Sequence, residues 1–254
     1  MAMIINKLRA TYSKIFYNEF YSIKRKVNGM LSVRNYSKIY GLVTKLPNLD
    51  IVEIGGASGA GSIIIAKAIK DSNKKSKLIV VEKCRGGSRD EVGDYDSNLN
   101  LIRNNFRMYD LEDQIILHPQ EITIENGSEV IKKIQTEKIA ALIHDADGHL
   151  ERDFLLFWPL LIDNGLIIVD DYSEKTVFTK VSTRHPQGGI KSLMTYRLLN
   201  QLIEWGLFKV DTQIGDTIYG TKPVNADFSK LDMQKCQKII NQVKEEHRRF
   251  ITHN

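Results

Sequence analysis

The feature that most constrains this chain is a repeated alternation of short apolar runs with longer amphipathic segments. Five runs rich in Ile, Val, Leu and Ala have the length of buried strands: residues 49–54, 77–82, 114–118, 139–144 and 165–169. Helical patterns separate them, at residues 59–71, 96–109, 127–135 and 150–161. Strands joined by helical crossovers pair in parallel, with both faces of the sheet covered. The sequence therefore predicts an α/β fold around a doubly wound sheet.

The C-terminal part of the chain predicts a different edge for this sheet. Residues 207–213 and 216–221 have strand patterns, and the turn between them is too short for a crossover helix. We expect an antiparallel hairpin there, after a helix over residues 190–204. The complete prediction is a Rossmann-like, mostly parallel sheet with an antiparallel C-terminal edge hairpin and helices on both faces.

Charge and helical pattern divide the chain into three parts. Helical patterns over residues 3–27 and 35–45 define a basic N-terminal helical segment, residues 1–45, and a charged pattern over 229–250 defines a C-terminal helix, residues 225–254. Residues 46–224 form the central domain. The charged helix has an apolar side, so it could dock on its own domain or pair two subunits into a homodimer.

The first fifty residues contain nine Lys or Arg against two acids, Glu19 and Asp50. This excess of positive charge is compatible with peripheral contact to an anionic membrane surface. No nucleic-acid-binding motif accompanies it, so nucleic acid is not an expected partner. Cys84 and Cys236 lack the spacing of a metal site or a disulfide framework. Without a signal-peptide pattern or an apolar run of transmembrane length, we expect a cytoplasmic protein.

A glycine-rich loop follows the first strand. Glu53 ends the apolar run, and four glycines follow within the segment Gly55 to Gly61. Glycines there let the backbone turn sharply and approach a ligand at the start of a helix. A phosphate-binding loop of the Gly-Lys-Ser/Thr type is excluded because the lysine is absent. The glycine spacing also fits a short-chain dehydrogenase, but no tyrosine has a lysine four residues later.

Acids at two consecutive strand ends favour another ligand. Glu53 precedes the glycines, and Glu82 ends the next strand, where a carboxylate can accept ribose hydroxyls. This pattern resembles the class I S-adenosylmethionine-dependent methyltransferases, with the form E/D-x-G-x-x-x-G. The resemblance implies a bound S-adenosylmethionine in the central domain, near a set of residues at the strand ends: Glu53, Gly55, Gly56, Ala57, Ser58, Gly59, Ser62, Glu82, Gln120, Glu121 and Asp145.

Four more acids follow the fourth and fifth strands. Asp145 and Asp147 come after residues 139–144, and Asp170 and Asp171 come after 165–169. Carboxylates converging on one sheet edge repel one another, and a hard divalent cation such as Mg²⁺ relieves that repulsion. They could instead be solvated loop acids, one of them capping the next helix.

The segment "FWPLLIDNGLIIVDDY" is similar to metal-dependent O-methyltransferases of the catechol, caffeoyl-coenzyme A, antibiotic-sugar and cephalosporin types. Trp158, Pro159, Gly165, Asp170 and Asp171 fall in register with the pattern of those enzymes. The resemblance spans roughly residues 35–172. It implies a magnesium ion, or another divalent cation, held by Asp145, Asp170 and Asp171.

One position departs from that pattern. The family places its proton-accepting Lys or His three residues after the first metal acid, and this chain has Gly148 there and His149 next. We take His149 and Asp145 as the catalytic residues. Two alternatives stay open: Asp147 could be the first ligand, and His149 could merely cap the next helix. His144, within the strand, is expected to be packed rather than to bind metal.

The predicted function is S-adenosylmethionine-dependent O-methyl transfer, assisted by a divalent metal, to a hydroxyl of a small molecule or sugar of natural-product or surface-glycan type. Residues 173–191 form a basic segment expected to choose the substrate, with Lys175, Lys180, Arg184, His185 and Lys191. The alternatives are an NAD(P)-dependent short-chain-type oxidoreductase, a nucleic-acid methyltransferase, or a catalytically silent fold.

Overall fold

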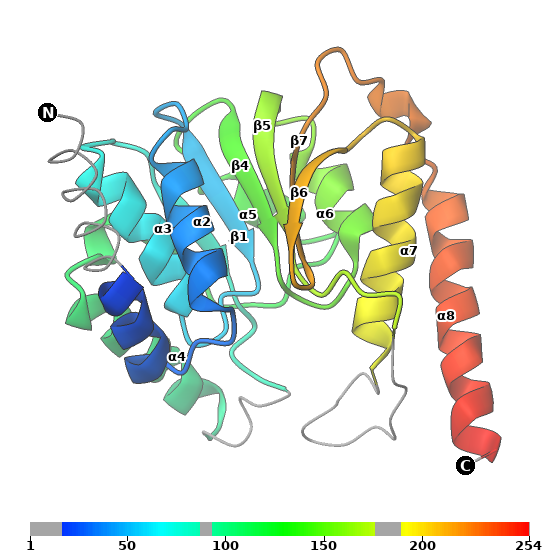
Figure 1. Ribbon diagram of the computed structural model, residues 1–254, viewed down its shortest axis with the longest axis horizontal. Helices are drawn as coiled ribbons and strands as arrows, with labels where there is room; N and C mark the ends of the chain where they lie inside the picture. Colours follow the sequence, from blue (N-terminus) through cyan, green and yellow to red (C-terminus); the bar gives the residue numbers. More distant parts are fainter. Residues whose placement is uncertain (1–16, 87–92, 176–188, 254) are drawn as a thin grey trace, which may run out of the picture.

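The computed structural model describes residues 17–86, 93–175 and 189–253 and contains one seven-stranded sheet (Figure 1). The strand order is β3-β2-β1-β4-β5-β7-β6. The strands are β1 Asp50–Ile54, β2 Leu78–Val81, β3 Ile115–His118, β4 Ile139–His144, β5 Leu161–Val169, β6 Lys209–Ile214 and β7 Thr217–Thr221. Strands β1 to β5 are parallel, and β7 runs antiparallel to both β5 and β6. The predicted fold class is confirmed.

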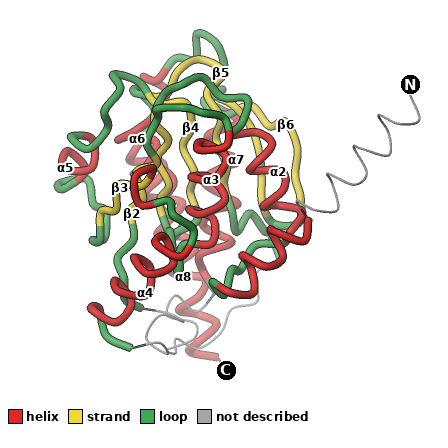
Figure 2. The backbone as a smooth tube through the Cα atoms, turned by 90° about the vertical axis from the view of Figure 1, so that its left-hand side faces the viewer, coloured by secondary structure: helices red, strands yellow, loops and turns green. Residues whose placement is uncertain are grey.

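Helices cover both faces of the sheet, and each face has its own apolar core. The helices are α2 Val33–Val43, α3 Ala60–Asp71, α4 Tyr95–Met108, α5 Gly127–Ile131, α6 Leu150–Phe157, α7 Ile190–Glu204 and α8 Met233–His253, with a further helical stretch at 17–26. Figure 1 shows α2, α3 and α4 on one side of the strands and α6, α7 and α8 on the other. Figure 2 shows α2 and α3 lying over the strands on the first of these sides.

The N-terminal segment packs on the sheet domain. Phe20, Ile23 and Val27 are buried in the same apolar cluster as Tyr36 and Ile39 of α2. Parts of the sequence predictions lie outside the described residues: the helix from residue 3 to 16, and the basic residues Lys180, Arg184 and His185 of the substrate segment. The limits of the three predicted parts of the chain stay a prediction.

Helix α8 docks on its own domain. Cys236, Ile240 and Val243 are buried in the cluster that contains the apolar side of α7. At the far end of the contact, the Arg197 guanidinium donates to the Glu246 carboxylate at 2.7 and 2.8 Å. Within the described part of the chain, no helix is both long and apolar enough to cross a membrane.

Two element limits differ from the prediction for identifiable reasons. Helix α6 ends at Phe157 rather than near residue 161, because Pro159 has no N–H to continue it. The buried Lys222 ammonium then donates to the carbonyls of Trp158 and Leu161, so β5 can begin at Leu161. Helix α8 begins at Met233, not at 229, because the Asp232 side chain accepts from the N–H of Lys235 as an N-cap.

Strand order places the functional residues. The order reverses between β1 and β4, and ligands of open α/β sheets bind beyond the carboxyl ends at such a point. Ile54 pairs with His144, and His144 pairs with Val169. The N–H of Asp145 then donates to the Ile54 carbonyl, and the N–H of Asp170 to the His144 carbonyl, both at 2.9 Å. Backbone pairing thus aligns the residue that follows each strand.

Candidate active site

Three carboxylates meet at this edge of the sheet. Asp145 follows β4, and Asp170 and Asp171 follow β5; one carboxylate oxygen from each lies within 4.8 Å of the others. All three side chains are half-buried. Hard carboxylate oxygens in this number fit Mg²⁺ or another hard divalent ion, so we name Asp145, Asp170 and Asp171 the acid cluster. Of the two candidates for a first ligand, Asp145 is the one that belongs to this cluster.

Asp147 points elsewhere. Its carboxylate accepts two hydrogen bonds from the Arg152 guanidinium, at 2.7 and 3.1 Å. Burial alone would raise the pKa of Asp147, but the charge of Arg152 outweighs burial and holds that pKa well below its usual range. Arg152 also donates to Asp153 at 2.7 Å. The expectation that all four acids converge is therefore wrong for Asp147, because Arg152 in the first turn of α6 pairs with it.

A lysine lies among the three acids. Lys191, at the start of α7, brings its Nζ to 3.2 Å from an Asp145 oxygen and into an ion pair with Asp171. Burial acts to lower the pKa of Lys191, yet the two carboxylates outweigh it and the pKa stands above its ordinary value. From sequence we placed Lys191 in a basic segment expected to choose the substrate; in the structure its partners are two acids of the cluster.

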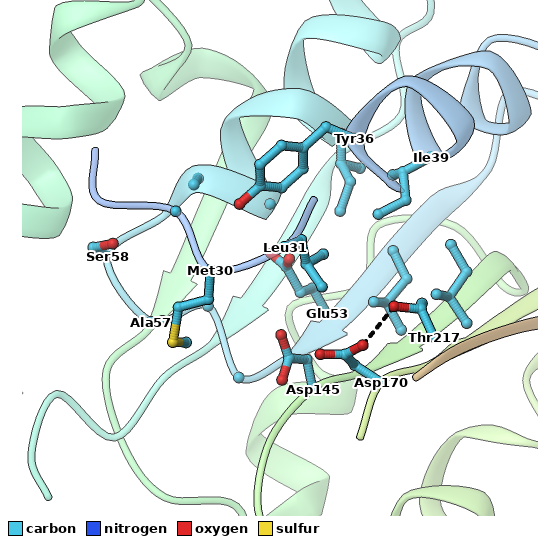
Figure 3. A pocket seen from close by; sticks show the side chains of 18 of the residues that line it. Met30, Leu31, Tyr36, Ile39, Glu53, Ala57, Ser58, Asp145, Asp170 and Thr217 are labelled. Atoms are coloured by element: carbon cyan, nitrogen blue, oxygen red, sulfur yellow. Dashed lines mark hydrogen bonds between the residues drawn. The ribbon is translucent and has the colours of Figure 1, made fainter. Parts of the chain in front are cut away.

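The orientation of Asp170 depends on a short hydrogen-bond chain. The Thr217 hydroxyl donates to Asp170 at 2.5 Å, as the dashed line in Figure 3 shows. Asn35 of α2 donates to the Thr217 hydroxyl at 2.9 Å, and the Tyr219 hydroxyl donates to the Asn35 carbonyl oxygen at 3.1 Å. We call Asp170, Thr217, Asn35 and Tyr219 the Asp170 chain.

The glycine loop passes close beneath the acids. Gly55 and Gly59 have φ of 96° and 94°, in the left-handed region that glycine adopts readily. A Cβ added to Gly55 would stand 2.0 Å from the Asp145 carbonyl oxygen. The close approach of the loop to the end of β4 therefore requires glycine at this position.

Glu53 is buried under the loop. The Ser62 hydroxyl, in α3, donates to its carboxylate at 2.5 Å. Burial raises the pKa of Glu53 to about 8, against the lowering effect of the Ser62 hydrogen bond, and the charges of Asp145 and Glu82 raise it further. A cationic group in the adjoining pocket would favour the ionised form of Glu53.

Glu82, the acid after β2, is also buried. Its carboxylate accepts from the N–H of Ala57 in the glycine loop at 2.6 Å and from the N–H of Cys84 at 2.9 Å. It therefore fixes the loop to the end of the second strand. Gln120 and Glu121, after β3, are exposed at the surface.

A pocket lies between the glycine loop, the acid cluster and α2 (Figure 3). Six of the residues predicted to bind cofactor line it: Glu53, Gly55, Gly56, Ala57, Ser58 and Asp145. In Figure 3 the carboxylates of Asp145 and Asp170 lie side by side, with Tyr36 across the cavity from them. The other predicted residues Gly59, Ser62, Glu82, Gln120 and Glu121 are not among the residues that line this pocket.

Sequence reasoning missed one wall of this pocket. Asn28 to Leu31, between the 17–26 helix and α2, line it together with Tyr36 and Ile39. Ser58 of the glycine loop donates to the Val27 carbonyl at 2.6 Å, and Lys24 donates to the Met30 carbonyl at 3.2 Å. The available signal was the Asn-Gly pair at 28–29, which is typical of a turn.

The two histidines near β4 have acidic partners. His149 stands at the N-cap position of α6, and its Nδ1 lies 2.8 Å from a Glu151 oxygen, which raises its pKa. It is not among the residues that line the pocket. His144 is buried, as expected, with Nδ1 2.6 Å from Asp153. A catalytic role of His149 stays a prediction.

Comparison with known proteins identifies the domain that carries this site. Residues 52–172 match a family model described as a methyltransferase domain. Among curated proteins, no sequence matches the chain significantly.

Solved methyltransferases have a similar fold. A Podospora anserina methyltransferase, PaMTH1, bound to S-adenosylhomocysteine has 16% identity and a TM-score of 0.59, over 88% of this chain and 96% of its own. A Bacillus cereus O-methyltransferase in complex with S-adenosylhomocysteine has 15% identity and a TM-score of 0.55, over 82% and 90%. TomG, an O-methyltransferase of Streptomyces achromogenes in complex with S-adenosylmethionine, has 13% identity and a TM-score of 0.54, over 82% and 89%. At these identities the likeness establishes the fold.

The family match includes the glycine loop, Glu82 and all three acids of the cluster, and it favours methyl transfer over the NAD(P)-dependent alternative. Residues 52–172 therefore match a methyltransferase domain, and the fold of the chain is similar to that of solved methyltransferases.

Proposed function

We propose that this protein transfers the methyl group of S-adenosylmethionine to a hydroxyl of a small molecule or sugar, assisted by a divalent ion held by Asp145, Asp170 and Asp171. The observation that carries the proposal is the position of the acid cluster, since Asp145 and Asp170 line the same pocket as the glycine loop. A cofactor on the loop and an acceptor at the acids would be neighbours.

The cofactor is assigned to the glycine-loop pocket by its chemistry. The buried Glu53 suits the cationic amino-acid end of S-adenosylmethionine, and the loop backbone from Gly55 to Ser58 can approach its carboxylate and ribose. Glu82 stands at the strand end where ribose hydroxyls are bound in this fold. In the structure Glu82 accepts two backbone N–H groups, so we propose that it also positions the loop.

The residues of this chain have three tasks in the proposed reaction. The acids hold the acceptor oxygen near the pocket, and the loop holds the cofactor in line with it, which lowers the entropic part of the barrier. A divalent ion bound at the cluster would supply Lewis acidity that favours an ionised acceptor hydroxyl. His149 is proposed to accept the hydroxyl proton at Nε2, because Nδ1 is engaged by Glu151.

The class of acceptor is proposed from the similar proteins. TomG takes part in tomaymycin synthesis, which supports a natural-product type of acceptor here. A surface-glycan sugar is the other acceptor that the basic residues 173–191 favour.

Metal dependence gives the first testable prediction. Asp171→Asn should lower methyl transfer to catechol or sugar-nucleotide acceptors by at least about a hundredfold, as should EDTA, because either change removes charge stabilisation of the acceptor oxygen. Transfer of the labelled methyl group from S-adenosylmethionine measures it. Asp211→Asn, at an exposed position of edge strand β6, is the matched control. Full transfer by Asp171→Asn, with no response to EDTA, would remove the metal from the proposal.

A further inference from the structure

We propose that Lys191 and a divalent ion compete for one site: the Lys191 ammonium occupies the acid cluster when no ion is bound, and an ion enters only as the ammonium leaves. This inference rests on the proposed metal site and concerns what controls access to it. Its observation is the pair of contacts from Lys191 Nζ to Asp145 and Asp171, two of the three acids of the cluster.

The two cations need the same carboxylates. Lys191 Nζ lies 3.2 Å from Asp145 Oδ1 and forms an ion pair with Asp171 Oδ2. One oxygen from each of the three carboxylates lies within 4.8 Å of the other two. A divalent ion coordinated by the same acids would lie within a few ångströms of the ammonium. Like charges at that separation in a half-buried site repel strongly, so simultaneous occupation is unfavourable.

Local structure does not otherwise explain a lysine at this position. Lys191 is the second residue of α7, and a cation in the first turn of a helix is disfavoured by the helix dipole. Lys191 is held there by the acids. The position has little exposure to water, with 24% of its side chain accessible, so the attraction is only partly screened.

Gly148 makes room for this arrangement. It has φ of 86°, and a Cβ added to it would stand 3.0 Å from the Lys191 carbonyl oxygen and 3.0 Å from the Met194 side chain. The loop after β4 therefore packs directly on the first turn of α7. This contact keeps Lys191 beside the acids, so the competing cation is part of the packed structure.

Direct ion binding tests the competition. Lys191→Met should bind Mn²⁺ at least about tenfold more tightly than the wild type in calorimetric titration, because the occupying charge is gone. Lys191→Arg keeps the charge and should bind no more tightly than the wild type. Lys175→Met removes the same charge from the exposed end of the segment after β5 and serves as the control, with unchanged affinity expected. Equal affinities for Lys191→Met and the wild type would overturn the proposal, as would the absence of Mn²⁺ binding in both.

A second measurement uses the wild-type protein and needs no variant to fold. Reductive methylation of lysines, read by mass spectrometry, should modify Lys191 several-fold faster with Mn²⁺ than without it, because a displaced ammonium is more accessible. Lys175 should react at the same rate in both conditions. A Lys191 rate that stays the same or falls when Mn²⁺ is added would contradict the competition.

These results separate the competition from the proposed function. Displacement of Lys191 by Mn²⁺ together with EDTA-insensitive methyl transfer would support the shared site and reject the metal's role in the reaction. EDTA-sensitive transfer, with Lys191 labelling and Lys191→Met affinity both unchanged, would support the reaction and reject the competition.

Discussion

Glu53 is buried and lines the pocket beside the glycine loop. Its carboxylate has Ser62 as a hydrogen-bond donor, and its other described electrostatic neighbours, Asp145 and Glu82, are acids. Burial is the largest cause of its raised pKa of about 8. In the free protein the carboxyl group is therefore protonated up to neutral pH.

Stability should depend on pH through this group. The folded protein holds the Glu53 proton up to about pH 8, whereas the unfolded chain releases it near the ordinary glutamate pKa of 4.5. Unfolding therefore releases a proton between these values, and the free energy of unfolding falls as pH rises. Relative to Glu53→Gln, the wild type should lose up to about 1 kcal/mol per pH unit between pH 5 and 8.

Urea unfolding of both proteins at several pH values measures this difference. Asp145, whose pKa burial raises to about 7, titrates in both proteins, so the two curves differ only by the titration of Glu53 and by its charge interaction with Asp145. Parallel curves for the wild type and Glu53→Gln would mean that Glu53 is ionised in the folded state.

At the residue scale, the sequence predicted which acids stand at the strand ends but not the direction of every side chain. The proximity of Asp145 and Asp170 at the sheet edge follows from strand register alone. Asp147 could not be excluded from sequence, because its partner Arg152 faces it only once α6 begins at Leu150. The ion pairs of Lys191 were not predicted, because they join segments far apart in the chain.

Among the elements, the glycine loop between β1 and α3 has the tightest geometry. Gly55→Ala should destabilise the fold by at least about 2 kcal/mol, because its Cβ would meet the Asp145 backbone and its φ is left-handed. S-adenosylhomocysteine binding should be lost as well. Thermal unfolding and calorimetry measure the two effects.

Gly41→Ala is the matched control for this loop prediction. Gly41 lies within α2, and a Cβ there would have no neighbouring atom within 4 Å. The substitution should leave stability unchanged or raise it by up to about 1 kcal/mol, as alanine does in helix interiors. Equal stability and equal S-adenosylhomocysteine binding of Gly55→Ala and Gly41→Ala would mean that neither property requires the close approach of the loop to β4.

Strand and helix patterns predicted the elements well where apolar runs were long, as in β4. They could not predict Thr217 as a site residue. We searched for site residues at the carboxyl ends of the parallel strands. Strand β7 runs antiparallel to β5, so its first residue, Thr217, lies at that same edge of the sheet. The wall formed by Asn28 to Leu31 was missed because a turn signal does not say what the turn packs against.

At the scale of the whole molecule, cofactor binding should stabilise the folded chain. S-adenosylhomocysteine at a hundred times its Kd should add about 2.7 kcal/mol to the free energy of unfolding, because it binds the folded state alone. NAD at the same concentration should add nothing. Melting curves with each ligand measure this, and stabilisation by NAD alone would favour the oxidoreductase reading.

The fold class was predictable because alternation of strands and helices leaves few ways to cover a parallel sheet. The N-terminal contribution to the site was not, since helix pattern alone does not say where α2 packs. Asn35 of α2 becomes part of the site only through its hydrogen bond to Thr217 in the hairpin β6–β7, which extends the sheet beyond β5.

The Asp170 chain has a consequence for the order in which the protein matures. Asn35 and Thr217 are separated by 182 positions, so their hydrogen bond cannot form until the chain has been synthesised and released from the ribosome beyond β7. A nascent or prematurely terminated chain that lacks β7 therefore has Asp170 without its hydroxyl partner. Methyl transfer should begin only after β7 has joined the sheet.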